Sequence, residues 1–104
     1  MHNRCVEIRT AHDAAQHRFV LYVSEQVAAI SEYFETKEQR TFFHTVTFPQ
    51  YRGRGLAAVL TEYALDDTRT CGMTVVPSCW FVREFIETNT VEYGSLLTSA
   101  EPPA

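Results

Sequence analysis

Several common protein classes are excluded by what this sequence lacks. No apolar run approaches the roughly 20 residues that a membrane helix needs. The first residues, MHNRCVE, lack the apolar core of a signal peptide. Neither the phosphate-loop pattern G-x-x-x-x-G-K-[ST] nor the dinucleotide pattern G-x-G-x-x-G occurs. These absences argue against a membrane-spanning or exported protein, a P-loop nucleotide hydrolase and a dinucleotide-binding fold.

Cysteine and basic residues are also scarce. The three cysteines, Cys5, Cys71 and Cys79, are an odd number, and no pair has C-x-x-C spacing. Free thiols in a reducing cytoplasm are therefore expected, without a metal site, and Cys5 and Cys71 are interpreted as structural. The 9 Lys and Arg residues against 13 Asp and Glu residues give a formal charge of −4. This balance argues against general nucleic-acid binding, which needs a basic surface.

The chain is long enough for one folded domain. It has 104 residues, of which 45% are hydrophobic, and domains commonly contain about 100–150 residues. The last six residues, SAEPPA, are rich in proline and small side chains. We therefore predict a single domain over residues 1–98 and a flexible tail over residues 99–104.

The first half of the sequence indicates strands and the second half indicates helices. Alternating or β-branched patterns predict strands, and Pro49 ends the last of them; these strands cover residues 6–9, 18–23, 27–34 and 40–48. In the last of these strands, alternation places Phe42, His44, Val46 and Phe48 on one face. Apolar residues with helical spacing follow at residues 56–64, then a strand at 73–76 and a second helix at 79–89. The order β-β-β-β-α-β-α predicts an α+β fold.

The most informative segment is the turn Gln50-Tyr51-Arg52-Gly53-Arg54-Gly55 between a strand and a helix. Its two glycines permit positive φ and a close approach of a ligand to the backbone. The helix that follows presents unpaired N–H groups and the positive end of its dipole, which favours phosphate. The alternative is an ordinary turn with solvated arginines.

The chain resembles the GNAT-type N-acetyltransferases, and most closely their small single-domain subfamily. Three motifs carry the resemblance, in the family's order: His44-Thr45, Arg52-Gly53-Arg54-Gly55-Leu56-Ala57 and Pro77-Ser78-Cys79-Trp80-Phe81-Val82. Gln50 completes the signature [RQ]-x-x-G-x-[GA]. The segment Asn89-Thr90-Val91 departs from the subfamily's usual His-Pro sequence, and the N-terminal helices of larger relatives are absent.

The resemblance implies a GNAT-like fold, with a mostly antiparallel sheet and a strand–helix–strand–helix unit that binds acetyl-CoA. Backbone amides from about Tyr51 to Leu56 would hold the pyrophosphate, and N–H groups near Val46 to Phe48 would bind the acetyl oxygen. The implied contact residues are Val46, Phe48, Gln50, Tyr51, Arg52, Gly53, Arg54, Gly55, Leu56 and Ala57. Without the N-terminal helices, the acceptor site must be shallow or completed by a partner.

Two residues are candidates for the chemistry, on opposite walls of the same notch. His44 is a candidate general base, because its ordinary pKa lies near neutral pH; the alternative is a structural histidine. Cys79 is a candidate nucleophile, or an acid that protonates the departing sulfur; the alternative is a small buried residue. Tyr93 is interpreted as a core or rim tyrosine, with a general acid as the alternative, and Trp80 as a packing residue or part of the lining of an acceptor groove. Solvated faces are expected for the acidic residues Glu32, Glu35, Asp66 and Asp67; the alternative is an acidic rim that attracts a cationic amine.

The predicted function is acetyl-CoA-dependent N-acetylation of a primary amine, on a protein lysine or a small molecule, by a monomer or weak homodimer. The alternative is a non-catalytic module with the same fold that senses acyl-CoA or binds a protein partner.

Overall fold

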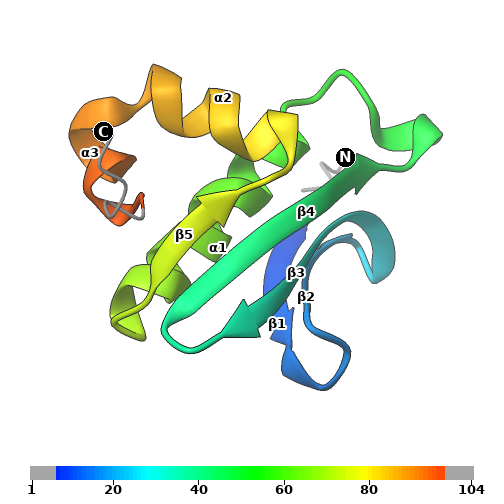
Figure 1. The fold of residues 1–104 in the computed structure, drawn as a ribbon. Helices are drawn as coiled ribbons and strands as arrows, with labels where there is room; N and C mark the ends of the chain where they lie inside the picture. The colour runs from blue at the N-terminus through cyan, green and yellow to red at the C-terminus, as the bar shows by residue number, and fades with distance from the viewer. Residues whose placement is uncertain (1–6, 98–104) are drawn as a thin grey trace.

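The computed structural model describes residues 7–97 and contains one five-stranded sheet with the strand order β1-β2-β3-β4-β5 (Figure 1). β1 to β4 form an antiparallel meander, and β5 pairs parallel with β4. The strands are β1 (Ile8–Asp13), β2 (Arg18–Val23), β3 (Gln26–Thr36), β4 (Gln39–Thr47) and β5 (Thr74–Pro77). The helices are α1 (Leu56–Thr70), α2 (Trp80–Thr88) and α3 (Thr90–Tyr93), and 3₁₀ turns occupy Ala14–Gln16, Pro49–Tyr51 and Gly94–Leu96.

The predicted α+β order is confirmed, while several boundaries move. β1 continues to Asp13, because residues 8–13 pair in register with β2, well beyond the predicted end at residue 9. α1 continues to Thr70 and ends just before Gly72, which has φ +74°. The predicted tail at 99–104 lies outside the described residues. No helix within residues 7–97 is both long and apolar enough to span a membrane.

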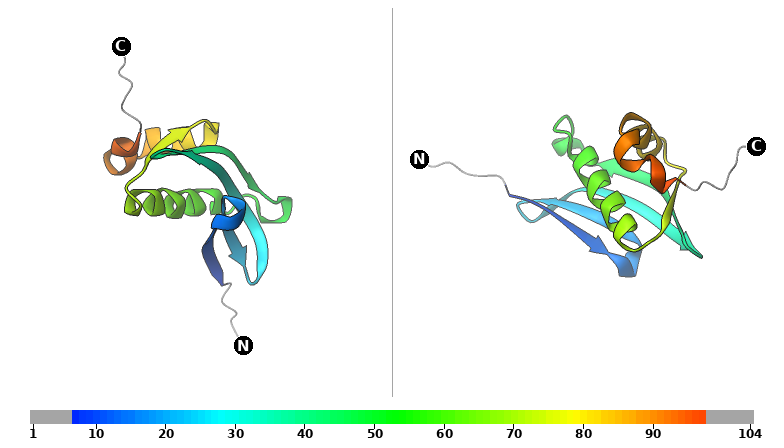
Figure 2. Two further views of the ribbon diagram at one scale, coloured as in Figure 1. Left: turned by 60° about the horizontal axis from the view of Figure 1, so that its bottom comes forward. Right: turned by 90° about the vertical axis from the view of Figure 1, so that its left-hand side faces the viewer.

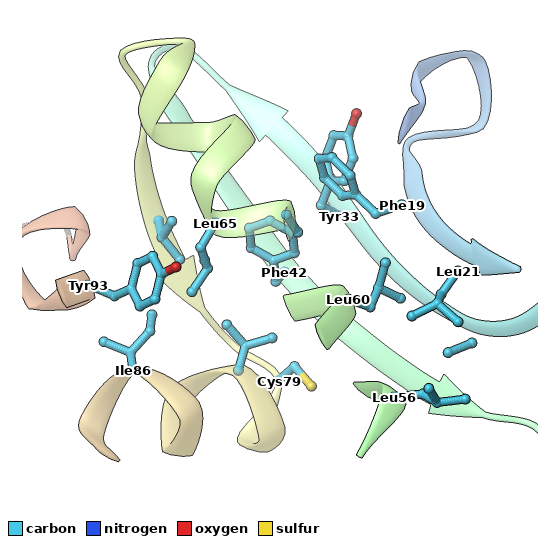
Figure 3. Close-up of a cluster of buried hydrophobic side chains, with 14 of the residues drawn as sticks. Phe19, Leu21, Tyr33, Phe42, Leu56, Leu60, Leu65, Cys79, Ile86 and Tyr93 are labelled. Atoms are coloured by element: carbon cyan, nitrogen blue, oxygen red, sulfur yellow. The ribbon is translucent and has the colours of Figure 1, made fainter. Parts of the chain in front are cut away.

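The hydrophobic core lies between the sheet and α1. Phe19 and Leu21 of β2, Tyr33 of β3 and Phe42 of β4 meet Leu60 and Leu65 of α1 in one buried cluster (Figure 3). α2 adds its own apolar side and contacts α1, β4 and β5. Figure 2 shows α1 along one side of the curved sheet. We call this side of the sheet the α1 face.

β4 contains a bulge that changes which face its side chains occupy. Tyr33 lies opposite Phe42 and Glu32 lies opposite His44, so that Phe43 has no partner of its own. In a bulge, two residues of one strand face a single residue of its neighbour, and the alternation beyond it is inverted. Phe42 is buried against α1, whereas Phe43 and His44 are both exposed on the opposite side. The prediction that Phe42 and His44 share a face is therefore wrong.

The opposite side of the sheet, which we call the open face, faces the viewer in Figure 1 and has no described helix in front of β3. Glu32 and Phe34 of β3 and Phe43 and His44 of β4 point to it, because the α1 face takes the intervening Tyr33.

A buried arginine joins the sheet to the C-terminal half of α1. The Arg40 guanidinium donates to Glu35 at 2.9 Å and to Asp67 at 3.0 Å, and it stacks over the ring of Tyr33. Burial opposes the charge of Arg40, but the hydrogen bonds to Asp67 and Glu35 hold its pKa above the ordinary value. The predicted solvated face holds for exposed Glu35, whereas Asp67 is partly buried; both carboxylates also neutralise this cation.

Candidate active site

The candidate site lies where β4 and β5 separate. Their parallel pairing ends at Phe42 opposite Pro77, and the Cys79 N–H still donates to the Phe42 carbonyl at 2.9 Å. Beyond this point the polypeptide leaves the sheet and enters α2 at Trp80, while β4 continues to Thr47. A pocket of about 270 Å³ opens beside the separated strand; it is lined by Thr47, Tyr51, Arg52, Gly53, Gly55, Leu56, Ala57, Ala58 and Phe81. A larger hollow at the β3–β4 hairpin contains none of the predicted site residues.

The glycine turn presents a row of unpaired backbone donors to this pocket. The N–H groups of Tyr51 and Arg52 are used inside the 3₁₀ turn, by the carbonyls of Phe48 and Pro49. Val59 is the first residue whose N–H donates to the turn, at the Gly55 carbonyl. Within residues 7–97, the amides of residues 53–58 have no acceptor. The free donors thus begin two residues later than expected from the sequence.

Two glycine conformations create this arrangement. Gly53 has φ +82° and Gly55 has φ +75°, in the left-handed region that other residues enter at a cost. Gly55 directly precedes α1, and no side chain caps the helix there. The turn therefore combines an uncapped helix N-terminus with free amides, an arrangement suited to a phosphate.

The two arginines of the turn contribute differently. Arg52 donates from Nε to the Thr47 carbonyl at 3.0 Å and so attaches the turn to the end of β4. The Arg54 guanidinium lies 5.6 Å from the ring centre of buried Tyr51. Within residues 7–97 neither forms an ion pair with a carboxylate. Their charge is available to an anion at the turn, although the whole chain is acidic.

The bulge also decides which amides of β4 face the separation. The Phe48 N–H donates to the Ala28 carbonyl of β3 at 2.9 Å. Hydrogen-bonded pairs alternate along an antiparallel ladder, so Val46 also directs its N–H toward β3. Thr45 and Thr47 consequently direct their N–H groups to the side that β5 has left. Of the predicted stretch from Val46 to Phe48, only Thr47 has this orientation.

His44 and Cys79 flank β4 from different sides. The ring Nδ1 of His44 lies 2.8 Å from Glu32 Oε1 on the open face. Cys79 is 7% exposed, and its Sγ lies 3.5 Å from the Thr45 hydroxyl, which belongs to the α1 face. Figure 3 shows the sulfur directed away from α2 toward β4. No hydrogen bond joins His44 to Cys79 within the described residues.

The remaining singled-out side chains have clear positions. Tyr93 is buried and donates to Asp66 at 2.9 Å; burial, reinforced by Asp66, raises the pKa of its hydroxyl. Trp80 is 67% exposed, and Cys71 is exposed too, so neither packs in the core. Cys5 lies outside the described residues. Residues 7–97 contain no cluster of His, Cys, Asp and Glu that could hold a metal ion.

Glu32, Thr45 and Phe81 belong to the site region, although the sequence indicated neither a contact of Glu32 with His44 nor individual roles for Thr45 and Phe81. Glu32 and Thr45 reach His44 and Cys79 only through the inverted alternation beyond Phe43. Phe81 of α2 lines the pocket from the other side, although it lies 26 residues after Gly55 in the chain. Its place in the Pro77 to Val82 motif is the one sequence signal that could have indicated it.

Comparison with known proteins agrees with the fold. The family model for the GCN5-related N-acetyl-transferase matches residues 18–96. Among solved structures, the fold resembles the ribosomal-protein-S18-alanine N-acetyltransferase from Escherichia coli, with a TM-score of 0.54 and 24% sequence identity. The alignment covers 56% of this chain and 38% of that one, so the chain spans well under half of that neighbour. No curated protein matches the sequence.

The family model covers most of the chain, and the fold resembles that of a solved N-acetyltransferase. The chain belongs to the GCN5-related N-acetyl-transferase family.

Proposed function

We propose that the domain over residues 1–98 transfers the acetyl group of acetyl-CoA to a primary amine. The observation that carries this proposal is the row of free amides at residues 53–58, beside the pocket that opens where β4 and β5 separate. The family match over residues 18–96 supports the same reaction class.

The residues present suit acetyl-CoA. Amides of the turn and the first turn of α1 would hold the pyrophosphate, with Arg52 and Arg54 adding positive charge nearby. Phe81 and Leu56 supply an apolar lining for the part of acetyl-CoA between the phosphates and the thioester. When bound, acetyl-CoA supplies an activated acetyl thioester.

His44 is proposed as the base that accepts the amine proton. Glu32 accepts a hydrogen bond from Nδ1 across the ladder, which leaves Nε2 unprotonated in the neutral ring and able to take a proton. Glu32 is therefore proposed as a positioning residue that selects this tautomer. The exposure of His44 on the open face allows an amine to approach it from solvent.

Cys79 is proposed as an acid that protonates the departing sulfur, in preference to a nucleophile. A nucleophilic thiol is activated by a neighbouring base or by a helix N-terminus. Cys79 is at the N-cap of α2, but its Sγ contacts the neutral hydroxyl of Thr45, and within residues 7–97 it forms no hydrogen bond with a base. The amides of Thr45 and Thr47 are proposed to stabilise the charge that develops on the acetyl oxygen.

Titration calorimetry with acetyl-CoA, followed by intact mass and an amine panel, tests this function. We expect micromolar binding, no acetylated enzyme, and acetyl transfer to at least one amine. An added acetyl mass that disappears in Cys79→Ser would overturn the acid role in favour of a covalent route. Binding without transfer to any amine would indicate the non-catalytic sensor, and absence of binding would refute both.

A further inference from the structure

The open face carries an unusual pair of aromatic side chains beside the candidate base. Phe34 and Phe43 are each 48% exposed, and their ring centres lie 5.9 Å apart. They come from neighbouring strands, and Phe43 directly precedes His44 in the chain. Within residues 7–97 nothing packs over them to remove them from water.

The bulge explains why the aromatic pair and the base occur together. In a regular strand, adjacent residues point to opposite faces, so Phe43 and His44 would lie on opposite sides of the sheet. The unpaired position of Phe43 places both side chains on the open face. Half-exposed apolar side chains that contact each other are more typical of a binding surface than of solvated sheet.

The charge of this surface favours a cationic ligand. Glu32 lies opposite His44 on the neighbouring strand and two residues from Phe34 on its own strand. Arg18 faces Glu32 across the ladder, but its guanidinium is held by Asp13 at 3.3 Å. The whole chain carries a formal charge of −4. A protonated amine is therefore attracted to this part of the face before it gives up its proton.

We propose that the open face formed by Glu32, Phe34, Phe43 and His44 is the acceptor surface, and that it takes a lysine side chain of a polypeptide with an apolar neighbour. This inference rests on the proposed function. A free small amine reaching His44 makes no use of the aromatic pair. Two residues of an extended peptide span the same length as the two residues from Glu32 to Phe34 on β3, about 3.3 Å per residue. An apolar side chain two residues from a lysine at Glu32 would therefore lie over Phe34.

Two nine-residue peptides with a blocked N-terminus and one free central lysine test the proposal. One carries leucine two residues before and after the lysine, and the other carries serine there. We expect kcat/KM for the leucine peptide to exceed that for the serine peptide about tenfold, through KM. The ratio should fall close to one in the Phe34→Ser/Phe43→Ser variant. Ile8→Ser, also at a 48% exposed apolar residue but on β1, is the matched control and should keep the ratio.

Binding of the same peptides without acetyl-CoA, followed by backbone amide NMR shifts on β3 and β4, gives a readout that does not depend on catalysis. Wild-type transfer to a small amine with equal use of both peptides would overturn the acceptor surface and leave the proposed function standing. A wild-type dimer that becomes a monomer in the double variant would also overturn it, since the occupant would then be a second copy. If the double variant does not fold, Phe34→Gln alone replaces it.

Discussion

Replacing Gly55 by glutamate is the sharpest test of the anion site, because the chain contains a matched control. Gly55 has φ +75° and Gly72 has φ +74°, and a Cβ added at either position meets no atom within 4 Å. Gly55 lines the pocket at the start of α1, whereas Gly72 follows the end of the same helix. Gly55→Glu and Gly72→Glu therefore impose similar backbone strain and the same change in net charge.

The two effects can be calculated separately. Forcing a side chain into the left-handed region costs about 1 kcal/mol, which lowers Tm by about 4–8 °C for a domain of this size. We expect this loss in both variants, and a further loss of about 0.3–1 kcal/mol in Gly72→Glu, because a carboxylate after the C-terminus of α1 opposes the helix dipole. At the turn, the new carboxylate would lie about 6 Å from a bound phosphate; at an effective dielectric constant of about 20, the repulsion is about 3 kcal/mol, or about 100-fold in Kd.

Titration calorimetry with acetyl-CoA and thermal unfolding on the same samples give both quantities. A large rise in Kd for Gly55→Glu alone, with Gly72→Glu at least as destabilised in Tm, would support the site. An unchanged Kd in Gly55→Glu would remove the turn from the binding site. An equal rise in Gly72→Glu would show that strain, and not the position of the charge, controls affinity. Because exposed charges are screened, the difference should shrink at high ionic strength.

Three further predictions concern individual side chains. His44→Ala should lower kcat by about 100-fold. Glu32→Ala should lower kcat by about tenfold, and Glu32→Gln should restore part of it, because glutamine retains an acceptor for the His44 Nδ1–H. A ¹⁵N NMR spectrum that shows the same His44 tautomer in Glu32→Ala as in the wild type would contradict the positioning role of Glu32. Cys79→Ser should slow transfer without changing the Kd for acetyl-CoA, and an unchanged kcat would reduce Cys79 to packing. Burial lowers the pKa of His12 below 6.5, so the unfolded chain binds a proton at His12 more readily than the folded chain does. The contribution of His12 to stability is therefore present above pH 6.5 and is lost as the pH falls. The urea midpoint should drop less between pH 7 and pH 5 in His12→Asn than in the wild type.

The element order and the glycine turn were predictable because they depend on local signals. The helical spacing from Leu56 onward and the end of the strand before Pro49 each depend on a few neighbouring residues. The structure confirms the helix start and the strand end. The bulge at Phe43 was not predictable from alternation, because it depends on how β3 and β4 pair. This single inserted residue moves His44 to the open face and shifts the inward amides to Thr45 and Thr47.

The Arg40 cluster illustrates the second limit of the sequence. Glu35 and Asp67 look like ordinary surface acids, and nothing within a helical turn or a strand repeat of either one indicates a buried partner. Their role depends on Arg40, which is nearly inaccessible and 27 residues from Asp67 in the chain. Removing one partner of such a group costs several kcal/mol, because the remaining charge stays buried. The cluster lies at the end of α1 opposite the glycine turn, and it fixes this helix against β4. Since the free amides of residues 53–58 lie at the other end of the same helix, Arg40 attaches to the sheet the helix that carries the proposed anion site.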